Sequence, residues 1–281
     1  MRYDHIRVRP ITPAIGAEIE GVDLGAPTTA QGAEIRRVLI DRKVIVFRDQ
    51  AISANAYAAF MRLFGAPVRE DLIAEDGRPP EVGAIHIRPA EPQRINYWHM
   101  DHSFREQPTP VLSLHAKLLP DCGGDTLFAS LEAAYDGLTD MMKSRIEGLY
   151  TNHKVTETQN SRRRYTDEQF AKMLAAPPVQ HPLVGLNPDN GRKYLFVNVP
   201  IYCRSIVGME SGEGDALLRE LYLHAQRPEF QMRLVWRPDT LTVWENCHCL
   251  HYPVADYFPQ ERKMWRVVIQ AERRPVAAQA A

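Results

Sequence analysis

Apolar and polar residues alternate along many short stretches of this chain, a spacing that turns one face of a β-strand towards a core. The β-branched run Lys43–Arg48 predicts a further strand that is buried on both faces. The Asn-Gly pair at the end of Asn187–Gly191 lies between two apolar runs and predicts a hairpin. The other predicted strands are Ile6–Ile11, Val82–Ile87, Val111–Leu119, Asp125–Ser130, His181–Leu186, Lys193–Val199, Gln231–Trp236, Thr240–Trp244 and Met264–Ala271.

Helical spacing of apolar residues occurs in only a few segments, for which Ser53 and Asp215 are predicted N-caps. The predicted helices are Ala30–Arg42, Ala54–Phe64, Leu131–Leu138, Thr139–Leu149 and Asp215–Gln226. Many short strands with few interior helices favour a mainly β fold with flanking α-helices. The expected core is an antiparallel sandwich or barrel with the helices packed outside.

Loops are predicted where polar residues cluster with Gly and Pro, at Arg69–Pro80 and at Glu245–Phe258. No clean linker divides the chain, so residues 1–281 are expected to form a single domain. The segment 151–180 is charged and polar and contains Arg162–Arg164. A solvated surface segment is the favoured interpretation, and a lid over a functional site is the alternative.

Composition narrows the function classes. Hydrophobic residues make up 44% of the 281 residues and charged residues 25%, which is ordinary for a globular protein with a sizeable core. A net charge of −1 argues against a nucleic-acid partner, and no apolar run is long enough to cross a membrane. The N-terminal residues have no apolar signal core, so a cytoplasmic location is expected. Four cysteines are too few for a disulfide scaffold.

His99-Met100-Asp101 places a histidine and a carboxylate two residues apart. In an extended strand both side chains point to the same face, where they could grip one metal ion. Two histidines and one carboxylate on one face of an ion are typical of non-haem Fe(II) oxygenases. The tripeptide alone is a weak signal, and a polar surface pair is the alternative. His102 would point to the opposite face and is not expected to be a ligand.

A second histidine is available late in the chain, where Trp244-Glu245-Asn246 runs into Cys247-His248-Cys249-Leu250-His251. On the residues alone, His248 and His251 both remain candidates. A zinc cluster formed with the cysteines is another interpretation, but structural zinc usually needs a second pair of ligands at Cys-x-x-Cys or similar spacing. None is present in the sequence.

Several fragments taken together in order resemble the taurine dioxygenase family, which consists of Fe(II)- and 2-oxoglutarate-dependent oxygenases. The resemblance covers nearly the whole chain, and its joint spacing is far more specific than any single fragment. The family also includes enzymes that open alkylsulfates and aryloxyalkanoates. The matching fragments are Gly16–Leu24, Phe64-Gly65, Trp98-His99-x-Asp101, Gly123-Gly124-Asp125-Thr126, Leu195–Asn198, Trp244-x-Asn246, His251-Tyr252, Arg262 and Arg266.

The resemblance implies a double-stranded β-helix (jelly-roll) core and a set of site residues. His99, Asp101 and His251 would be the ligands of Fe(II), with His251 preferred over His248 because of its spacing to Arg262. Thr126 and Arg262 would hold the co-substrate 2-oxoglutarate, since a guanidinium can bind a carboxylate through two parallel bonds. The implied reaction uses O2, decarboxylates 2-oxoglutarate to succinate and hydroxylates a substrate C–H bond. By analogy, family members are often dimers or tetramers, so a homo-oligomer is expected.

The substrate is expected to be a small anionic organic acid such as a sulfonate, an alkylsulfate or an aryloxyalkanoate. Arg266 would hold its acid group, with a surface ion pair as the alternative role. Tyr97 and Tyr202 would line the pocket, and for Tyr202 plain core packing is the alternative. The loop after Gly65 and the residues before His99 lack the taurine contacts of the family, so taurine itself is not favoured. Tyr97, Tyr202 and the apolar pair Leu72-Ile73 favour a bulkier, less polar acid. Alternatives are a true taurine dioxygenase and a catalytically silent jelly-roll binding protein.

Overall fold

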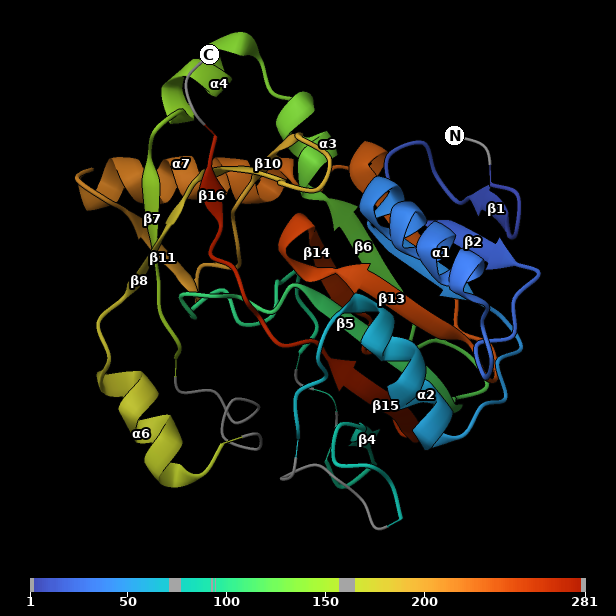
Figure 1. The fold of residues 1–281 in the computed structure, drawn as a ribbon. Coiled ribbons are helices and arrows are strands. Elements are labelled where there is room, and N and C mark those ends of the chain that lie inside the picture. Colours follow the sequence, from blue (N-terminus) through green and yellow to red (C-terminus); the bar gives the residue numbers. More distant parts are fainter. Residues whose placement is uncertain (1–2, 71–76, 92, 94, 157–164, 279–281) are drawn as a thin grey trace.

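The computed structural model describes residues 3–70, 77–91, 93, 95–156 and 165–278. Over these residues the protein is mainly β with several helices (Figure 1). The largest sheet has seven strands in the order β1-β2-β3-β13-β5-β15-β4, in which only β2 and β3 run parallel. These strands are β1 (Arg7–Pro10), β2 (Ala17–Glu20), β3 (Val44–Phe47), β4 (Gly83–Ile87), β5 (Val111–Leu118), β13 (Leu241–Glu245) and β15 (Arg262–Val268).

A three-stranded antiparallel sheet packs against one face of the large sheet. Its order is β12-β6-β14, formed by β12 (Gln231–Leu234), β6 (Thr126–Ser130) and β14 (Cys249–Pro253). Phe128 and Met232 of this small sheet share one buried cluster with Val46, Leu112 and Met264 of the large sheet. Inward-facing side chains of the two sheets therefore form a common core, as expected for stacked sheets. This core fixes β6, β14 and β15, which carry several of the candidate site residues.

Two helices cover the opposite face of the large sheet (Figure 1). They are α1 (Thr29–Arg42) and α2 (Ala54–Met61), and the 3-10 turn η1 (Arg62–Phe64) continues α2. Thr28 forms a capping box at the start of α1, and Ser53 caps α2 as predicted. Ile35 and Val38 of α1 and Phe60 of α2 are buried in one cluster with Ile45 and Phe47 of β3.

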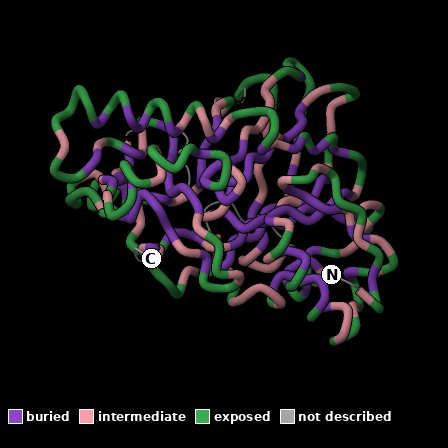
Figure 2. The backbone as a smooth tube through the Cα atoms, turned by 90° about the horizontal axis from the view of Figure 1, so that it is seen from above, coloured by how far each residue is buried: buried purple, intermediate pink, exposed green. Residues whose placement is uncertain are grey.

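The remaining elements build a second packed region around a separate buried cluster, which includes Leu217 and Leu221 of α7 together with Leu195 and Phe196. Two three-stranded sheets belong to it, with orders β11-β7-β8 and β10-β9-β16. Figure 2 shows that the buried backbone runs through the middle of the molecule while the periphery is exposed. The elements are α3 (Leu131–Asp136), α4 (Asp140–Ile146), β7 (Tyr150–His153), α6 (Asp167–Ala175), β8 (Val179–Pro182), β9 (Val184–Leu186), β10 (Lys193–Leu195), β11 (Cys203–Ile206), α7 (Ser211–His224), η3 (Pro228–Phe230), η4 (Asn246–His248) and β16 (Val276–Ala277).

Some predicted elements differ from the structure. The predicted loop Glu245–Phe258 contains η4 and the strand β14, because this segment pairs with β6. Helix α7 begins at Ser211 with Glu210 as its N-cap, so the prediction of Asp215 as the cap was wrong. The predicted strand around His99 is absent: His99 makes a single bridge, and Asp101 lies in a turn.

The segment 151–180, predicted as a surface segment or a lid, includes most of β7, the whole of α6 and the start of β8. Arg162–Arg164 lie outside the described residues. Among the described residues, no helix is long and apolar enough to span a bilayer.

Candidate metal centre and 2-oxoglutarate site

His99 and His251 are joined through their backbones. Each donates its N–H to the carbonyl oxygen of the other, at 2.9 Å from His99 and 2.8 Å from His251, which forms an isolated antiparallel bridge. Residues paired in this way project their side chains to the same side. The two imidazole rings accordingly lie 4.1 Å apart between centroids, and both residues are buried. The bridge therefore brings together two residues that are far apart in the sequence.

Asp101 completes the group. One potential ligand atom from each of His99, Asp101 and His251 can be chosen such that all three lie within 4.8 Å of one another. His99 Nε2 lies 3.5 Å from Asp101 Oδ1. His99 Nδ1 lies 3.0 Å from the carbonyl oxygen of Tyr97, which can only accept a hydrogen bond. A proton on Nδ1 would satisfy this contact and leave Nε2, on the side of Asp101, available to a metal ion.

Two buried asparagines hold the turn that carries Asp101. Asn246 accepts a hydrogen bond from the backbone N–H of Asp101 at 3.0 Å and donates one to the Asp101 carbonyl at 2.9 Å. Asn198 makes the same pair of contacts with Met100, at 3.0 and 2.9 Å. A side-chain amide that pairs with both the backbone N–H and the backbone carbonyl of one residue fixes that residue as a neighbouring strand would. These amides replace the predicted strand as the reason that Asp101 faces His99.

Arg266 on β15 is bound to two carboxylates. Its Nη2 lies 2.8 Å from Asp101 Oδ2, and its Nη1 lies 2.7 Å from Glu70 Oε1. Burial opposes the charge of Arg266, but Glu70 and Asp101 raise its pKa above the ordinary value. Burial likewise opposes the charge of Asp101, whereas His99 and Arg266 hold the pKa of its carboxyl well below the usual range. Arg266, which was predicted to hold the acid group of the substrate, is thus paired with two carboxylates of the protein and is buried, not part of a surface ion pair.

Arg262, also on β15, is buried but differs from Arg266 in its partners. It is 4% exposed, and among the described residues its Nε and Nη2 atoms have no hydrogen-bond partner. Burial lowers the pKa of Arg262 to about 10, so the side chain stays positively charged at neutral pH. Gly124 (φ +71°) leaves room beside it, since a Cβ there would lie 3.2 Å from Arg262 Cδ. A buried cation with free donors is a site prepared for an anion.

Thr126 lies near this cation at the start of β6. Its hydroxyl oxygen accepts a hydrogen bond from Trp236 Nε1 at 3.1 Å, which leaves the hydroxyl proton available to another acceptor. The Arg262 guanidinium lies 5.6 Å from the centre of the Trp236 ring. Trp236 therefore links the two residues that were predicted to hold 2-oxoglutarate.

The two predicted pocket tyrosines also lie together. The Tyr97 ring is 5.5 Å from that of His99, and burial together with Tyr202 raises the pKa of the Tyr97 phenol. Tyr202 is 5.8 Å from the Phe104 ring. Tyr165, in the segment predicted as a possible lid, accepts a hydrogen bond from Arg105 at 2.8 Å. Aromatic side chains thus gather on one side of His99.

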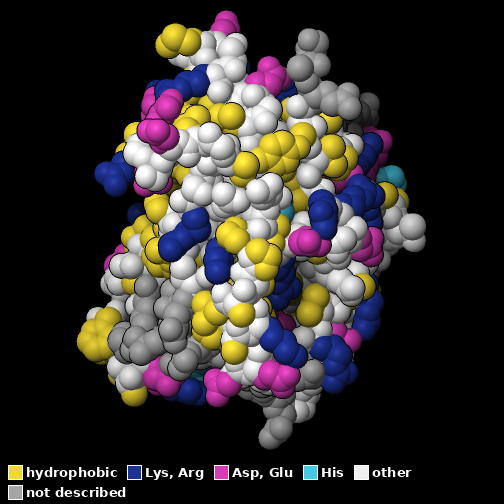
Figure 3. Space-filling model, turned by 90° about the vertical axis from the view of Figure 1, so that its left-hand side faces the viewer, with side chains coloured by type: hydrophobic (Ala, Val, Ile, Leu, Met, Phe, Trp, Pro, Cys, Tyr) yellow, Lys and Arg dark blue, Asp and Glu magenta, His cyan; other side chains and the backbone are white. Residues whose placement is uncertain are grey.

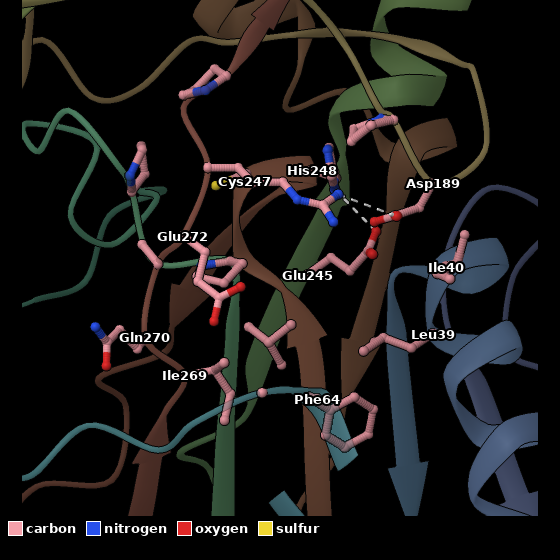
Figure 4. A pocket seen from close by; sticks show the side chains of 18 of the residues that line it. Leu39, Ile40, Phe64, Asp189, Glu245, Cys247, His248, Ile269, Gln270 and Glu272 are labelled. Carbon is pink, nitrogen blue, oxygen red and sulfur yellow. Dashed lines mark hydrogen bonds and ion pairs between the residues drawn. The ribbon is translucent and has the colours of Figure 1, made fainter. Parts of the chain in front are cut away.

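His248 is directed elsewhere. Its Nδ1 lies 3.0 Å from Glu245 Oε2, and its ring packs edge-on against Tyr194. Both His248 and Glu245 line a cavity of about 430 Å³ (Figure 4). Helix α1, η1, the segment Pro108–Val111, the β9–β10 connection and the segment after β15 also contribute to its walls, and none of the predicted site residues lines it. In the described part of the chain, His99, Asp101 and His251 are the only group with metal-site geometry, so the cysteines form no second cluster.

Sequence reasoning missed the residues that position this site. Asn198 and Asn246 were quoted as matching fragments but received no role, although a polar residue inside a buried apolar run was a usable signal. Glu70 was placed in a polar loop, and nothing local distinguishes it from its neighbours. Only the fold shows that it reaches Arg266.

Comparison with known proteins agrees with this geometry. Residues 7–268 match the family described as "Taurine catabolism dioxygenase TauD, TfdA family". A curated relative is the alpha-ketoglutarate-dependent 2,4-dichlorophenoxyacetate dioxygenase of Cupriavidus pinatubonensis. It is 33% identical over 263 residues, which cover 86% of this chain and 90% of the relative.

Two solved structures have closely similar folds. A taurine dioxygenase from Burkholderia xenovorans has a TM-score of 0.82 and 29% identity, and the match covers 99% of this chain and 96% of that one. The protein AAD-2, crystallised with Mn(II) and N-oxalylglycine, has a TM-score of 0.80 and 30% identity, with 96% and 99% covered. The chain therefore belongs to the TauD and TfdA family of Fe(II)- and 2-oxoglutarate-dependent dioxygenases.

Proposed function

We propose that His99, Asp101 and His251 bind the Fe(II) ion of this dioxygenase. The observation that carries the proposal is the convergence of two imidazoles and one carboxylate, with ligand atoms within 4.8 Å of one another. This donor set suits Fe(II) and leaves one face of the ion open. Arg266 binds Oδ2 of Asp101, so Oδ1, the atom nearer to His99, would be the carboxylate oxygen available to hold the metal.

Arg262 and Thr126 would hold 2-oxoglutarate. The free Nε and Nη2 atoms of Arg262 fit a carboxylate, and the Thr126 hydroxyl can donate to the same group. When bound, the metal and 2-oxoglutarate supply the oxidising power with O2, and succinate and CO2 are released. The protein neutralises the carboxylate, orients it through Trp236 and Thr126, and keeps this end of the site buried.

The substrate would be a small organic acid, namely a sulfonate, an alkylsulfate or an aryloxyalkanoate. Tyr97, Tyr202 and Arg266 would lie around it, and the tyrosine rings suit a body that is larger and less polar than taurine. Hydroxylation at the carbon that bears the sulfonate or ether oxygen would lead to C–S or C–O cleavage. The family membership supports this range of acids, since the curated relative named above acts on 2,4-dichlorophenoxyacetate.

The proposal extends to the architecture and the assembly. We propose that the large sheet and the β12-β6-β14 sheet form a double-stranded β-helix, which agrees with their shared core. A homo-oligomer is also expected, and no nucleic-acid partner. The face in Figure 3 mixes basic, acidic and hydrophobic side chains, in keeping with the small net charge.

The test is a panel of sulfonates, alkylsulfates and aryloxyalkanoates with purified protein, Fe(II) and 2-oxoglutarate. Succinate formation should rise with at least one of these acids and should be lost in His99→Ala. Taurine should give a lower rate than the best larger acid. If the protein bound 2-oxoglutarate but formed no succinate with any acid, the silent binding protein would be the correct alternative.

A further inference from the structure

Tyr257 lies beside Arg262, the buried arginine that is proposed to bind 2-oxoglutarate. Both side chains flank Gly124, where an added Cβ would lie 3.2 Å from Tyr257 Cδ1 and 3.2 Å from Arg262 Cδ. Tyr257 is 4% exposed, and burial raises the pKa of its phenol while the nearby charge of Arg262 lowers it. The tyrosine ring is therefore one wall of the buried space around this guanidinium and excludes water from that side.

The loop that carries Tyr257 is fixed to the start of β6. Val254 donates its N–H to the carbonyl oxygen of Asp125 at 2.9 Å, and Asp256 Oδ1 accepts the N–H of Gly124 at 2.7 Å. These contacts hold the main chain that leads into Tyr257. The hydroxyl at the far end of this side chain is held by a different residue.

That residue is Gln93, whose side-chain amide makes three hydrogen bonds. Its Nε2 donates to the carbonyl oxygens of Ile95 at 2.7 Å and Pro253 at 2.8 Å, and its Oε1 lies 2.7 Å from the Tyr257 hydroxyl. Carbonyl oxygens only accept hydrogen bonds, so the amide nitrogen must face Ile95 and Pro253. Because Oε1 can also only accept, the phenol donates its proton to Gln93. Gln93 thus fixes the direction of the Tyr257 hydroxyl.

Gln93 also joins the two chain segments that carry the proposed histidine ligands. Ile95 lies four residues before His99. Pro253 lies two residues after His251. The amide nitrogen bonds to one carbonyl group from each segment, and so continues through a side chain the connection that the backbone bridge between the histidines makes. One side chain therefore connects both metal-binding segments to the wall of the 2-oxoglutarate site.

We propose that Gln93 is a positioning residue for 2-oxoglutarate, an inference that rests on the proposed function and deepens it. Gln93 acts through Tyr257, whose ring it holds beside Arg262. Without this hydrogen bond the buried phenol would turn towards another acceptor and admit water next to the guanidinium. Water at that place weakens a charge-assisted hydrogen bond. The loss is confined to ligands that offer a carboxylate to Arg262.

Tyr257→Phe tests the link, because it removes one hydrogen bond and leaves both bonds from Gln93 to the backbone in place. The two probes are 2-oxoglutarate and 2-oxobutyrate, which has the same 2-oxo acid end but lacks the second carboxylate. Calorimetric titration of the Mn(II)-loaded protein measures binding without turnover. Tyr222→Phe is the control, because the Tyr222 hydroxyl donates to the Trp98 carbonyl oxygen at 2.8 Å, in the second packed region.

In Tyr257→Phe the dissociation constant of 2-oxoglutarate should rise about 3- to 10-fold, the effect of one lost hydrogen bond between neutral groups. That of 2-oxobutyrate should stay unchanged, and the control should change neither. Gln93→Leu should weaken 2-oxoglutarate binding at least as much, because all three bonds are lost. The double variant Gln93→Leu/Tyr257→Phe should bind no more weakly than Gln93→Leu, since the two residues share one contact.

Three results would overturn the role of Gln93. They are unchanged 2-oxoglutarate affinity in Tyr257→Phe, an equal loss for both 2-oxo acids in that variant, and additive effects of the two substitutions. Equal affinity of the unaltered protein for the two 2-oxo acids is a different outcome. It would remove Arg262 from its proposed role, and the inference about Gln93 would fall with it.

Discussion

At the scale of single residues, the clearest assignment is that of Arg262, because two nitrogens of this buried side chain have no hydrogen-bond partner within the part of the chain that the structure describes. A buried guanidinium with two free nitrogens is a costly arrangement in the absence of a ligand. An arginine on the protein surface would give little evidence for an anion-binding site, because water can satisfy its donors.

Replacing Arg262 with Ala should therefore weaken 2-oxoglutarate binding by more than about 100-fold, since loss of one partner of a buried ion pair costs roughly 3–5 kcal/mol. Titration of 2-oxoglutarate, followed by succinate release, measures the effect. Arg233→Ala is a suitable control, because Arg233 pairs with nearby Asp125 but is half exposed. An unchanged 2-oxoglutarate requirement in Arg262→Ala would remove this residue from the role.

The two late histidines give a second residue-scale prediction. His251→Ala should abolish stoichiometric binding of Fe(II), because one of three converging donors is lost. His248→Ala should retain the metal, because His248 contacts Glu245 and Tyr194 instead. Metal content after equilibrium dialysis distinguishes the variants, and metal loss in His248→Ala alone would reverse the assignment.

At the scale of elements, the turn that carries Asp101 depends on side-chain amides. Asn246 satisfies the N–H and carbonyl groups of Asp101 and also donates to the Thr109 carbonyl oxygen at 2.8 Å. No regular secondary structure supplies these bonds to the turn. The position of one proposed metal ligand therefore depends on a residue that binds no metal.

Asn246→Ala should destabilise the protein by about 1–3 kcal/mol, the cost of leaving buried backbone groups unsatisfied. It should also weaken metal binding, since Asp101 is no longer held. Asn152→Ala, which removes a hydrogen bond to Ser205 on β11, should cost stability without any change in metal affinity. Urea unfolding and metal titration of both variants would test the distinction; equal metal affinity in the two would contradict it.

Much of the fold could be predicted because local pattern and final environment agree. Lys43–Arg48 is β-branched and does form the buried strand β3, and Asn190-Gly191 does lie between the paired strands β9 and β10. Strand β14 could not be predicted, because its residues Cys249-Leu250-His251-Tyr252-Pro253 show no alternation of apolar and polar positions and include a proline. Its partners, β6 and His99, are remote in the sequence.

The candidate site, like the fold, could be predicted in part. The His-x-Asp tripeptide suggested a metal, but the reason given, a shared strand face, was incorrect. Glu70 could not be found in this way, since its contact with Arg266 joins residues that are 196 positions apart. A sequence pattern can identify candidate metal ligands. The carboxylates that form ion pairs with an arginine are known only once the three-dimensional structure is available.

At the scale of the whole molecule, a buried ionic cluster connects the two packed regions. Lys43, at the end of α1, lies 2.9 Å from Glu132 of α3 and 3.1 Å from Glu245 of β13. All three residues are buried. Burial opposes the charge of Glu245, but His248 and Lys43 hold its pKa below the usual value.

Lys43→Met should cost about 3–5 kcal/mol of unfolding free energy, because two buried carboxylates lose their shared cation. Lys193→Met removes a partly exposed pair with Glu147 and should cost less than about 1 kcal/mol. Denaturant unfolding of the two variants compares a buried ion pair with a surface ion pair. A loss of similar size in both would show that Lys43 does not hold the regions together.

Stability should also depend on pH through buried histidines. Burial lowers the pKa of His115 to about 4 and that of His153 well below its ordinary value. In the unfolded chain an imidazole titrates near pH 6.5, to within roughly a unit. Below that pH the unfolded state binds more protons than the native state, so stability falls as the pH is lowered.

For His115 the loss should extend from about pH 6.5 down to about pH 4, with a slope of at most about 1.4 kcal/mol per pH unit. Unfolding free energies measured in urea across this range would give the slope. The slope should be smaller in His115→Leu than in the unaltered protein. Identical slopes in both proteins would contradict the prediction.

The backbone bridge between His99 and His251 has a consequence for how the enzyme acquires its metal. The bridge is made by main-chain N–H and C=O groups, so it does not depend on the imidazoles that it orients. The folded chain can therefore present the two rings in register before any ion arrives, and removal of the ion by a chelator leaves the frame intact. If these residues bind Fe(II) as proposed, metal loading would be a reversible equilibrium of the folded protein, separate from the folding reaction itself.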